Sequence, residues 1–168
     1  MSHNVTVTRT TTTVTTTSAI LLNTGYLKTT SGILKVLQLI LGCVIVGLVG
    51  HYFVRSSPLF FTAELFLLLI ATTCLITTTC LLASCLLSIS TATIIAKTMF
   101  VSMLLIPESV LYLCATINYL VTIVSRNAGY SVAEYGYNNK MFAAALGAIN
   151  TGLYFVSALL AFRIYRRS

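Results

Sequence analysis

Residues 33–54 read ILKVLQLILGCVIVGLVGHYFV, and this stretch of 22 residues carries one formal charge, Lys35. A helix rises 1.5 Å per residue, so about 20 apolar residues cross a hydrocarbon core about 30 Å thick. Three further apolar runs follow at 59–88, 100–124 and 141–162. Because the bilayer core offers no water to the backbone, each run is expected to be a helix. The sequence therefore predicts an all-α polytopic membrane protein, a bundle of four transmembrane helices.

The overall composition agrees with membrane embedding. Charged residues make up 8% of the 168-residue chain, and its mean hydropathy is +0.95. Soluble domains use about 25% charged residues, and a chain of this length has room for one domain. A net charge of +7 would suggest nucleic acid as the partner of a soluble protein. Here the charges lie at span edges, so we expect anionic lipid headgroups as partners and no nucleic acid.

The chain divides into three predicted parts. Residues 1–31 are rich in Thr and have no acidic residue, so we expect a disordered tail, open to phosphorylation and without a cleavable signal peptide. Residues 32–163 form the four-span domain, and 164–168 form a basic tail. The run from 59 to 95 is long for one crossing but has no turn signal, which predicts one tilted helix that overhangs the membrane near 88–93.

Basic residues distinguish the two sides of the predicted bundle. An even number of spans places both termini on one side, and that side also holds the connection between the second and third spans. The positive-inside rule predicts that this side faces the cytosol, so the sequon Asn4-Val5-Thr6 there should stay unglycosylated. The predicted cytosolic cations are Arg9, Lys28, Lys35, Lys97, Arg163, Arg166 and Arg167, against Arg55, Arg126 and Lys140 on the other side.

The two outer loops are predicted to be short. Residues 55–58 allow only a tight turn, whereas 125–140 form the one sizeable loop. Tyrosines of the second loop either rest at the membrane interface, which we favour, or contact a partner.

Glu108 is the charged residue that lies deepest in a predicted span. About eleven helical residues from Lys97 place it about 16 Å into the membrane, where an ionised side chain costs about 2.5–3.5 kcal/mol. Thr72, Thr73 and Asn150 are predicted at a similar depth. One interpretation is a proton or ion pathway. We favour polar contacts that join the helices, because a pathway normally shows several ionisable groups in succession.

Glu64 and His51 lie near the outer ends of adjacent spans, and their equal depth predicts a pair. Catalysis would need a nucleophile, an orienting group and a water-accessible cleft. The sequence has no nucleophile elbow, metal-ligand cluster or phosphate loop. We therefore expect no enzymatic activity, no metal site and no cofactor.

Ala144, Ala148 and Gly152 repeat every four residues on the last span and form a small-residue face. Such faces let helix backbones approach closely in a membrane. We expect this contact inside the bundle, with contact between two copies of the chain as the alternative. Cys85 is a candidate palmitoylation site, although a small buried side chain is the favoured interpretation. The residues expected to anchor the cytosolic side are Lys97, Arg163, Arg166 and Arg167.

Three stretches of the spans resemble the MARVEL domain family. This family includes the chemokine-like-factor-like proteins, the myelin and lymphocyte protein group and the insect Singles bar type. Residues 32–42, GILKVLQLILG, resemble the family's opening G-x-L-K-x-x-E-x-x-x-G, with Gln38 where an acid is common. Residues 107–113, PESVLYL, are similar to its mid-membrane Glu followed by small and aromatic residues. Residues 143–154, AAALGAINTGLY, resemble its Ala- and Gly-rich stretch.

This resemblance implies a non-enzymatic tetraspan organiser, at the plasma membrane or on trafficking vesicles. Its work would be vesicle trafficking, membrane apposition or fusion, or assembly of sterol-rich domains. Implied partners are the bilayer, including sterol or anionic lipids, other membrane proteins or a second copy of the chain. Two alternatives from other classes are a small channel or proton-coupled transporter centred on Glu108, and an accessory subunit or chaperone for another membrane protein.

Overall fold

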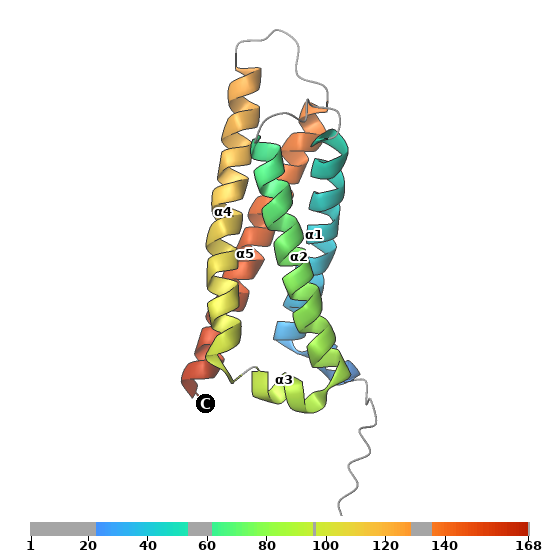
Figure 1. The fold of residues 1–168 in the computed structure, drawn as a ribbon, viewed down its shortest axis with the longest axis vertical. Helices are drawn as coiled ribbons and strands as arrows, with labels where there is room; N and C mark the ends of the chain where they lie inside the picture. The colour runs from blue at the N-terminus through green and yellow to red at the C-terminus, as the bar shows by residue number, and fades with distance from the viewer. Residues whose placement is uncertain (1–22, 54–61, 96, 129–135, 168) are drawn as a thin grey trace, which may run out of the picture.

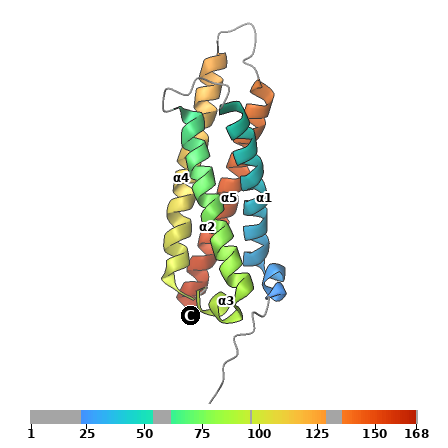
Figure 2. The same ribbon diagram turned by 45° about the vertical axis from the view of Figure 1, so that its right-hand side comes forward.

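Four long helices make up the bundle in the computed structural model, which describes residues 23–53, 62–95, 97–128 and 136–167. The helices are α1 (Thr30–Phe53), α2 (Ala63–Leu87), α4 (Met99–Asn127) and α5 (Tyr137–Arg167). They run alternately in opposite directions and lie side by side in both views (Figures 1 and 2). Each of the four is long and apolar enough to cross a membrane. The predicted all-α, four-span fold is confirmed.

Two short helices lie at one end of this bundle, which we call the base end. They are the 3-10 helix η1 (Thr24–Lys28) and α3 (Ile89–Ile95), and the base end also holds the C-terminal end of α5 (Figure 1). The opposite end, where α1 and α4 finish and α2 and α5 begin, is called the loop end.

The connection between α2 and α4 differs from the predicted overhanging helix, which is wrong. Helix α2 ends at Leu87, because Ser88 has an extended backbone with φ −144° and ψ 118°. The Ser88 hydroxyl then accepts a hydrogen bond from the Thr91 amide at 3.2 Å and caps α3. Serine is a favoured helix N-cap, so the chain turns at this residue and α3 crosses the base end (Figure 1).

The predicted terminal boundaries shift where the structure describes them. Residues 24–28 are helical, and the Asn23 amide donates to the Leu86 carbonyl at 2.8 Å, which ties η1 to the end of α2. The expectation of disorder therefore fails for residues 23–31, while 1–22 lie outside the described residues. Helix α5 continues to Arg167 through most of the predicted basic tail. The tight turn at 55–58, Tyr130 and Tyr135 also lie outside the described residues.

The core lies on the central axis and the outer wall is apolar. Helix α1 packs against α2 and α5, and α4 packs against the same two helices. Side chains such as Leu67, Tyr112 and Ile123 have no exposed surface, whereas Ile76 and Val121 are 59% and 58% exposed. Exposed aliphatic side chains over the length of all four helices are stable only against lipid. Their outward orientation matches a bundle surrounded by a bilayer.

Candidate functional site

The interior of the bundle contains a polar network centred on α5. Three α5 residues spaced four and three apart, Asn150, Tyr154 and Ser157, lie on one helix face and are buried. Ser157 Oγ accepts from Gln38 Nε2 of α1 at 2.8 Å. Tyr154 Oη lies 2.7 Å from the Thr78 hydroxyl of α2. Asn150 donates to the Tyr112 hydroxyl of α4 at 3.2 Å, so α5 forms hydrogen bonds to each of the other three spans.

Aromatic stacking and a backbone contact reinforce this network. The rings of Tyr112 and Tyr154 stack with centroids 5.6 Å apart, and the Tyr154 hydroxyl donates to the Cys74 carbonyl at 3.1 Å. Interhelical hydrogen bonds in membranes contribute about 0.6–2 kcal/mol each. The network therefore specifies how the four helices are rotated against one another.

Helices α4 and α5 approach each other closely at Gly147. A Cβ at this position would lie 3.0 Å from the Thr116 hydroxyl oxygen of α4, which is closer than side chains normally pack. Gly147 therefore allows the close packing of two helices that the sequence predicted for another face of α5, the face of Ala144, Ala148 and Gly152. Of the predicted face, Ala144 is buried, but Ala148 and Gly152 are exposed, and a Cβ at Gly152 would have no atom within 4 Å.

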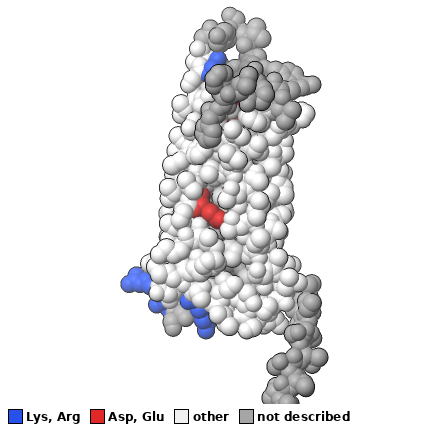
Figure 3. All heavy atoms as spheres, viewed as in Figure 1, with Lys and Arg blue, Asp and Glu red and all other residues white. Residues whose placement is uncertain are grey.

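Glu108 lies at mid-bundle in the seam between α4 and α2. Its side chain faces Thr77, and its Oε2 has no hydrogen-bond partner among the described residues. Thr72 and Thr73, expected nearby, donate instead to the carbonyls of their own helix at Leu68 and Leu69. The outer wall carries acidic atoms near mid-height (Figure 3), where α4 places Glu108, 8% exposed.

Glu64 forms a charged cluster at the loop end, which replaces the predicted pair with His51. Its Oε1 lies 2.6 Å from Arg126 Nη1 of α4 and 4.0 Å from Lys140 Nζ of α5. Glu64 and Lys140 are 1% and 2% exposed. His51 instead projects outward and packs its ring edge against Tyr52. The Glu64 carboxylate thus links α2, α4 and α5. His51 does not pair with it, because the rotation of α1 turns His51 outward.

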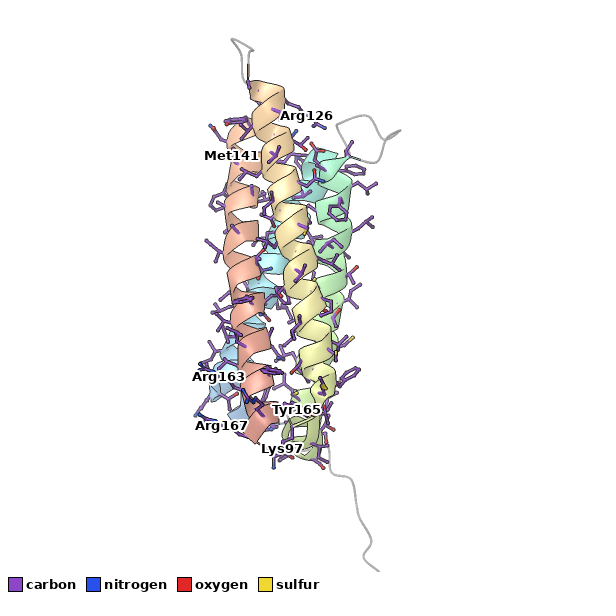
Figure 4. The ribbon with its side chains drawn as sticks, turned by 90° about the vertical axis from the view of Figure 1, so that its left-hand side faces the viewer. Lys97, Arg126, Met141, Arg163, Tyr165 and Arg167 are labelled. Carbon is purple, nitrogen blue, oxygen red and sulfur yellow. The ribbon has the colours of Figure 1, made fainter. Side chains whose placement is uncertain are left out.

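Most of the exposed cations among the described residues lie at the base end, whereas Arg126 is exposed at the loop end. The four predicted anchor residues are all exposed here, and Lys97, Arg163 and Arg167 lie together at the lower end of Figure 4, opposite Arg126 and Met141. In contrast, Lys35 is not at the headgroup edge as expected, because it is 4% exposed and points into the bundle. Cys85, the candidate palmitoylation site, is 4% exposed, and its modification stays a prediction.

Sequence reasoning missed several residues of this interior. Gln38, Thr78, Tyr112, Tyr154 and Ser157 all belong to the polar network. The available signal was the spacing of Asn150, Tyr154 and Ser157, which places three polar groups on one helix face. The described residues hold no group of three His, Cys, Asp or Glu side chains that would bind a metal.

Comparison with known families gives one finding. The model of the MARVEL family, described as a membrane-associating domain, matches residues 26–160. This range begins in η1, spans all four long helices and ends in α5, so it covers the polar network and the Glu64 cluster. Comparisons with curated proteins and with solved structures gave no match.

Proposed function

This chain belongs to the MARVEL family, and from that premise we propose that it is a non-enzymatic membrane organiser. Its work would be vesicle trafficking, membrane apposition or fusion, or the assembly of sterol-rich domains. The family is a membrane-organising domain type, and the protein is an integral multi-pass membrane protein with four spans. The plasma membrane or trafficking vesicles are the proposed sites of action.

The orientation of side chains carries this proposal. Polar groups such as Gln38, Asn150 and Tyr154 bond from helix to helix inside the bundle, while large hydrophobic side chains cover the outside. The described residues form no domain beyond the bundle and its two short base-end helices. A protein built in this way acts through its lipid-facing surface, on lipids and on neighbouring transmembrane helices.

The outer face of α5 supports lateral association. Ala148 and Gly152 are exposed, with open space over Gly152. Beside them lies an apolar groove between α4 and α5, of about 290 Å³, that Ala148 also lines. Small residues on a lipid-facing helix allow a second helix to approach closely. We propose that a neighbouring copy or another membrane protein packs at this face.

Gly152→Leu tests the lateral face. The variant should reduce self-association or partner capture in vesicles by several-fold without changing the thermal stability of the monomer, because the new side chain meets open space. Val156→Leu is the matched control, since Val156 is already a large exposed residue on the same helix. Equal association of all three proteins in single-molecule photobleaching, with equal partner capture, would contradict the proposed face.

The orientation of the chain is proposed from its charges. The base end carries the exposed cations Lys28, Lys97, Arg163, Arg166 and Arg167, while at the loop end Arg126 and Lys140 are held by Glu64. Cations attracted to anionic headgroups favour the cytosolic side. A glycosylation tag placed after Ser168 should remain unglycosylated. A glycosylated tag would show that the chain has the opposite orientation.

Proximity labelling tests the cellular role. A labelling enzyme fused to the full chain in its native cells should mark proteins of trafficking vesicles or of membrane contact sites. A matched enzyme on an unrelated four-span protein of the same compartment supplies the background. Labelling confined to the subunits of one channel or transporter complex would instead support the accessory-subunit alternative.

Transport through Glu108 is a second candidate, favoured by one observation. The Glu108 Oε2 has no hydrogen-bond partner among the described residues and lies deep in the span. Glu108→Gln separates the two functions in liposomes. Loss of a pH-dependent ion flux would support transport. No flux in either protein, with altered bundle stability in the variant, would support a purely structural role.

A further inference from the structure

A small cavity lies inside the base end of the bundle. It measures about 30 Å³ and is lined by residues of η1 and of all five α-helices, including Tyr26, Ser31, Lys35 and Ser157. Helix α3 crosses the base end of the bundle (Figure 1), and its Ala92 and Ile95 contribute to the cavity wall. A volume of this size holds one or two water-sized groups, so only the tip of a larger ligand can enter.

Lys35 gives this cavity a buried positive charge. Its side chain is 4% exposed, and among the described residues its ammonium has no recorded hydrogen bond and no carboxylate within 4 Å. Glu108 acts on it only through space. Burying an ammonium that has no carboxylate within 4 Å costs several kcal/mol, so an anion in the cavity would be favoured.

Besides the Cys85 thiol, the other polar groups of the cavity are hydroxyls that can donate to an anion. Ser157 Oγ accepts from Gln38, which leaves its own proton free for the cavity. Tyr26 Oη and Ser31 Oγ lie 3.3 Å apart at the half-buried rim. Burial raises the pKa of the Tyr26 phenol to about 12, so this hydroxyl keeps its proton. The lining residues that the structure describes include no carboxylate, which favours an anion over a cation as the ligand.

The position of the cavity indicates where the anion comes from. Lys35 is the sixth residue of α1, so it lies about 8 Å above the start of that helix, within reach of the base end of the bundle. The rim includes the exposed Ile164, beside which acyl chains can remain in the bilayer. Exposed cations around the base end attract acidic lipids toward the rim.

We propose that this cavity is a binding site for the phosphate of an acidic phospholipid, with Lys35 as the counter-charge and the Ser157, Tyr26 and Ser31 hydroxyls as donors. The small volume admits the terminal oxygens of a phosphate and no larger group. It therefore selects phosphatidic acid, whose phosphate carries no further group, over lipids that carry serine or inositol. The site is one of defined stoichiometry, unlike the diffuse attraction of exposed cations. It goes beyond the proposed organising role, and its failure would leave that role intact.

Native mass spectrometry of the full chain in detergent tests this site. One phosphatidic acid per chain should bind at least about tenfold more tightly than phosphatidylserine or phosphatidylcholine, as a charge-assisted hydrogen bond to a buried ion would give. Lys35→Met should abolish that preference, and Ser157→Ala should weaken it several-fold. Lys28→Met, which removes an exposed cation at the same end, should leave it unchanged.

If a variant does not fold, the melting temperature of the wild-type chain with each added lipid still tests the proposal. Phosphatidic acid should raise the melting temperature more than phosphatidylserine does, and inorganic phosphate should compete weakly. Equal binding of all three lipids, or equal losses in Lys35→Met and Lys28→Met, would overturn the proposal. Competition by inorganic phosphate as strong as by the lipid would overturn the lipid assignment.

Discussion

At the loop end, the Glu64 Oε1 lies 2.6 Å from Arg126 Nη1 and 4.0 Å from Lys140 Nζ. At the base end, Lys35 is buried, and no carboxylate of the described residues lies within 4 Å of its ammonium. Both ends bury basic side chains, but among the described residues only the loop end places a carboxylate within 4 Å of them. The loop-end cluster joins α2, α4 and α5. The base-end cation instead faces a cavity.

This difference separates a structural charge from a charge available for binding. Removing one partner of a buried ion pair leaves an uncompensated charge and costs about 3–5 kcal/mol, whereas replacing a buried charge that has no partner within 4 Å by an apolar group removes a desolvation cost. Equivalent substitutions at the two ends should therefore have opposite consequences for stability. That contrast is open to direct measurement.

Glu64→Gln should have the largest effect. Loss of the carboxylate charge removes the counter-charge that Glu64 gives to Arg126 and Lys140, so the free energy of unfolding should fall by about 3–5 kcal/mol. Titration with denaturing detergent in mixed micelles measures it. Arg126→Gln is the control and should cost less, because the Arg126 side chain is 38% exposed and Lys140 remains near Glu64. A Glu64→Gln variant as stable as wild type would show that the cluster is not structural.

Gly32→Ala should destabilise the base end next. Its Cβ would lie 2.1 Å from the backbone carbonyl oxygen of Tyr26, so η1 and α1 would have to separate. An overpacked contact of this kind costs about 1–3 kcal/mol. Hydrogen exchange should speed up in η1 and stay unchanged at the loop end.

Gly47→Ala is the matched control for that substitution. A Cβ at Gly47 meets no atom within 4 Å, and alanine in a helix is favoured over glycine by roughly 0.5–1 kcal/mol. The control should therefore be slightly more stable than wild type. Losses of equal size in both variants would argue against the close packing of η1 on α1.

Among the substitutions of buried charged residues, Lys35→Met should change the free energy of unfolding least, and it should raise that free energy rather than lower it. In detergent without lipid, the free energy of unfolding should stay constant or rise by about 1 kcal/mol, because an unpaired ammonium is replaced by an apolar side chain of similar length. The measurement is the same titration as for Glu64→Gln. A loss as large as that of Glu64→Gln would remove the contrast between the two ends.

Arg166→Gln should have the smallest effect. Arg166 is exposed at the end of α5, and surface substitutions away from specific contacts usually change stability by less than about 0.5 kcal/mol. Its unfolding transition should coincide with that of the wild-type chain. A clear shift would show that the exposed cations of the base end also stabilise the bundle.

Much of the fold could be predicted from single segments of the chain. The four spans follow from run length and apolarity, which are local properties, and the matching of the MARVEL family over residues 26–160 agrees with the motifs that suggested it. The break at Ser88 was missed because one capping serine is a weak signal within a long apolar run. Glu108 was placed correctly in its span, but its neighbours Thr77 and Lys35 were not identified.

The pairing of polar residues could not be predicted, and Glu64 shows the reason. Its partner Arg126 lies 62 positions away, and Gln38 and Ser157 lie 119 apart. Helices that are apolar on nearly every side carry no periodic signal for the face that turns inward. The rotation of each helix therefore had to come from packing, which turned Ala148 and Gly152 outward and Gly147 inward.

The sequence by itself determined that this protein is a four-span membrane bundle with a strongly basic side, because hydropathy, length and charge act on each segment separately. Only the tertiary structure decided that Glu64 joins three helices, that α5 bonds to every other span, and that Lys35 lies in a cavity. Those outcomes depend on how four helices rotate against one another, and that rotation is set by side chains far apart in the chain.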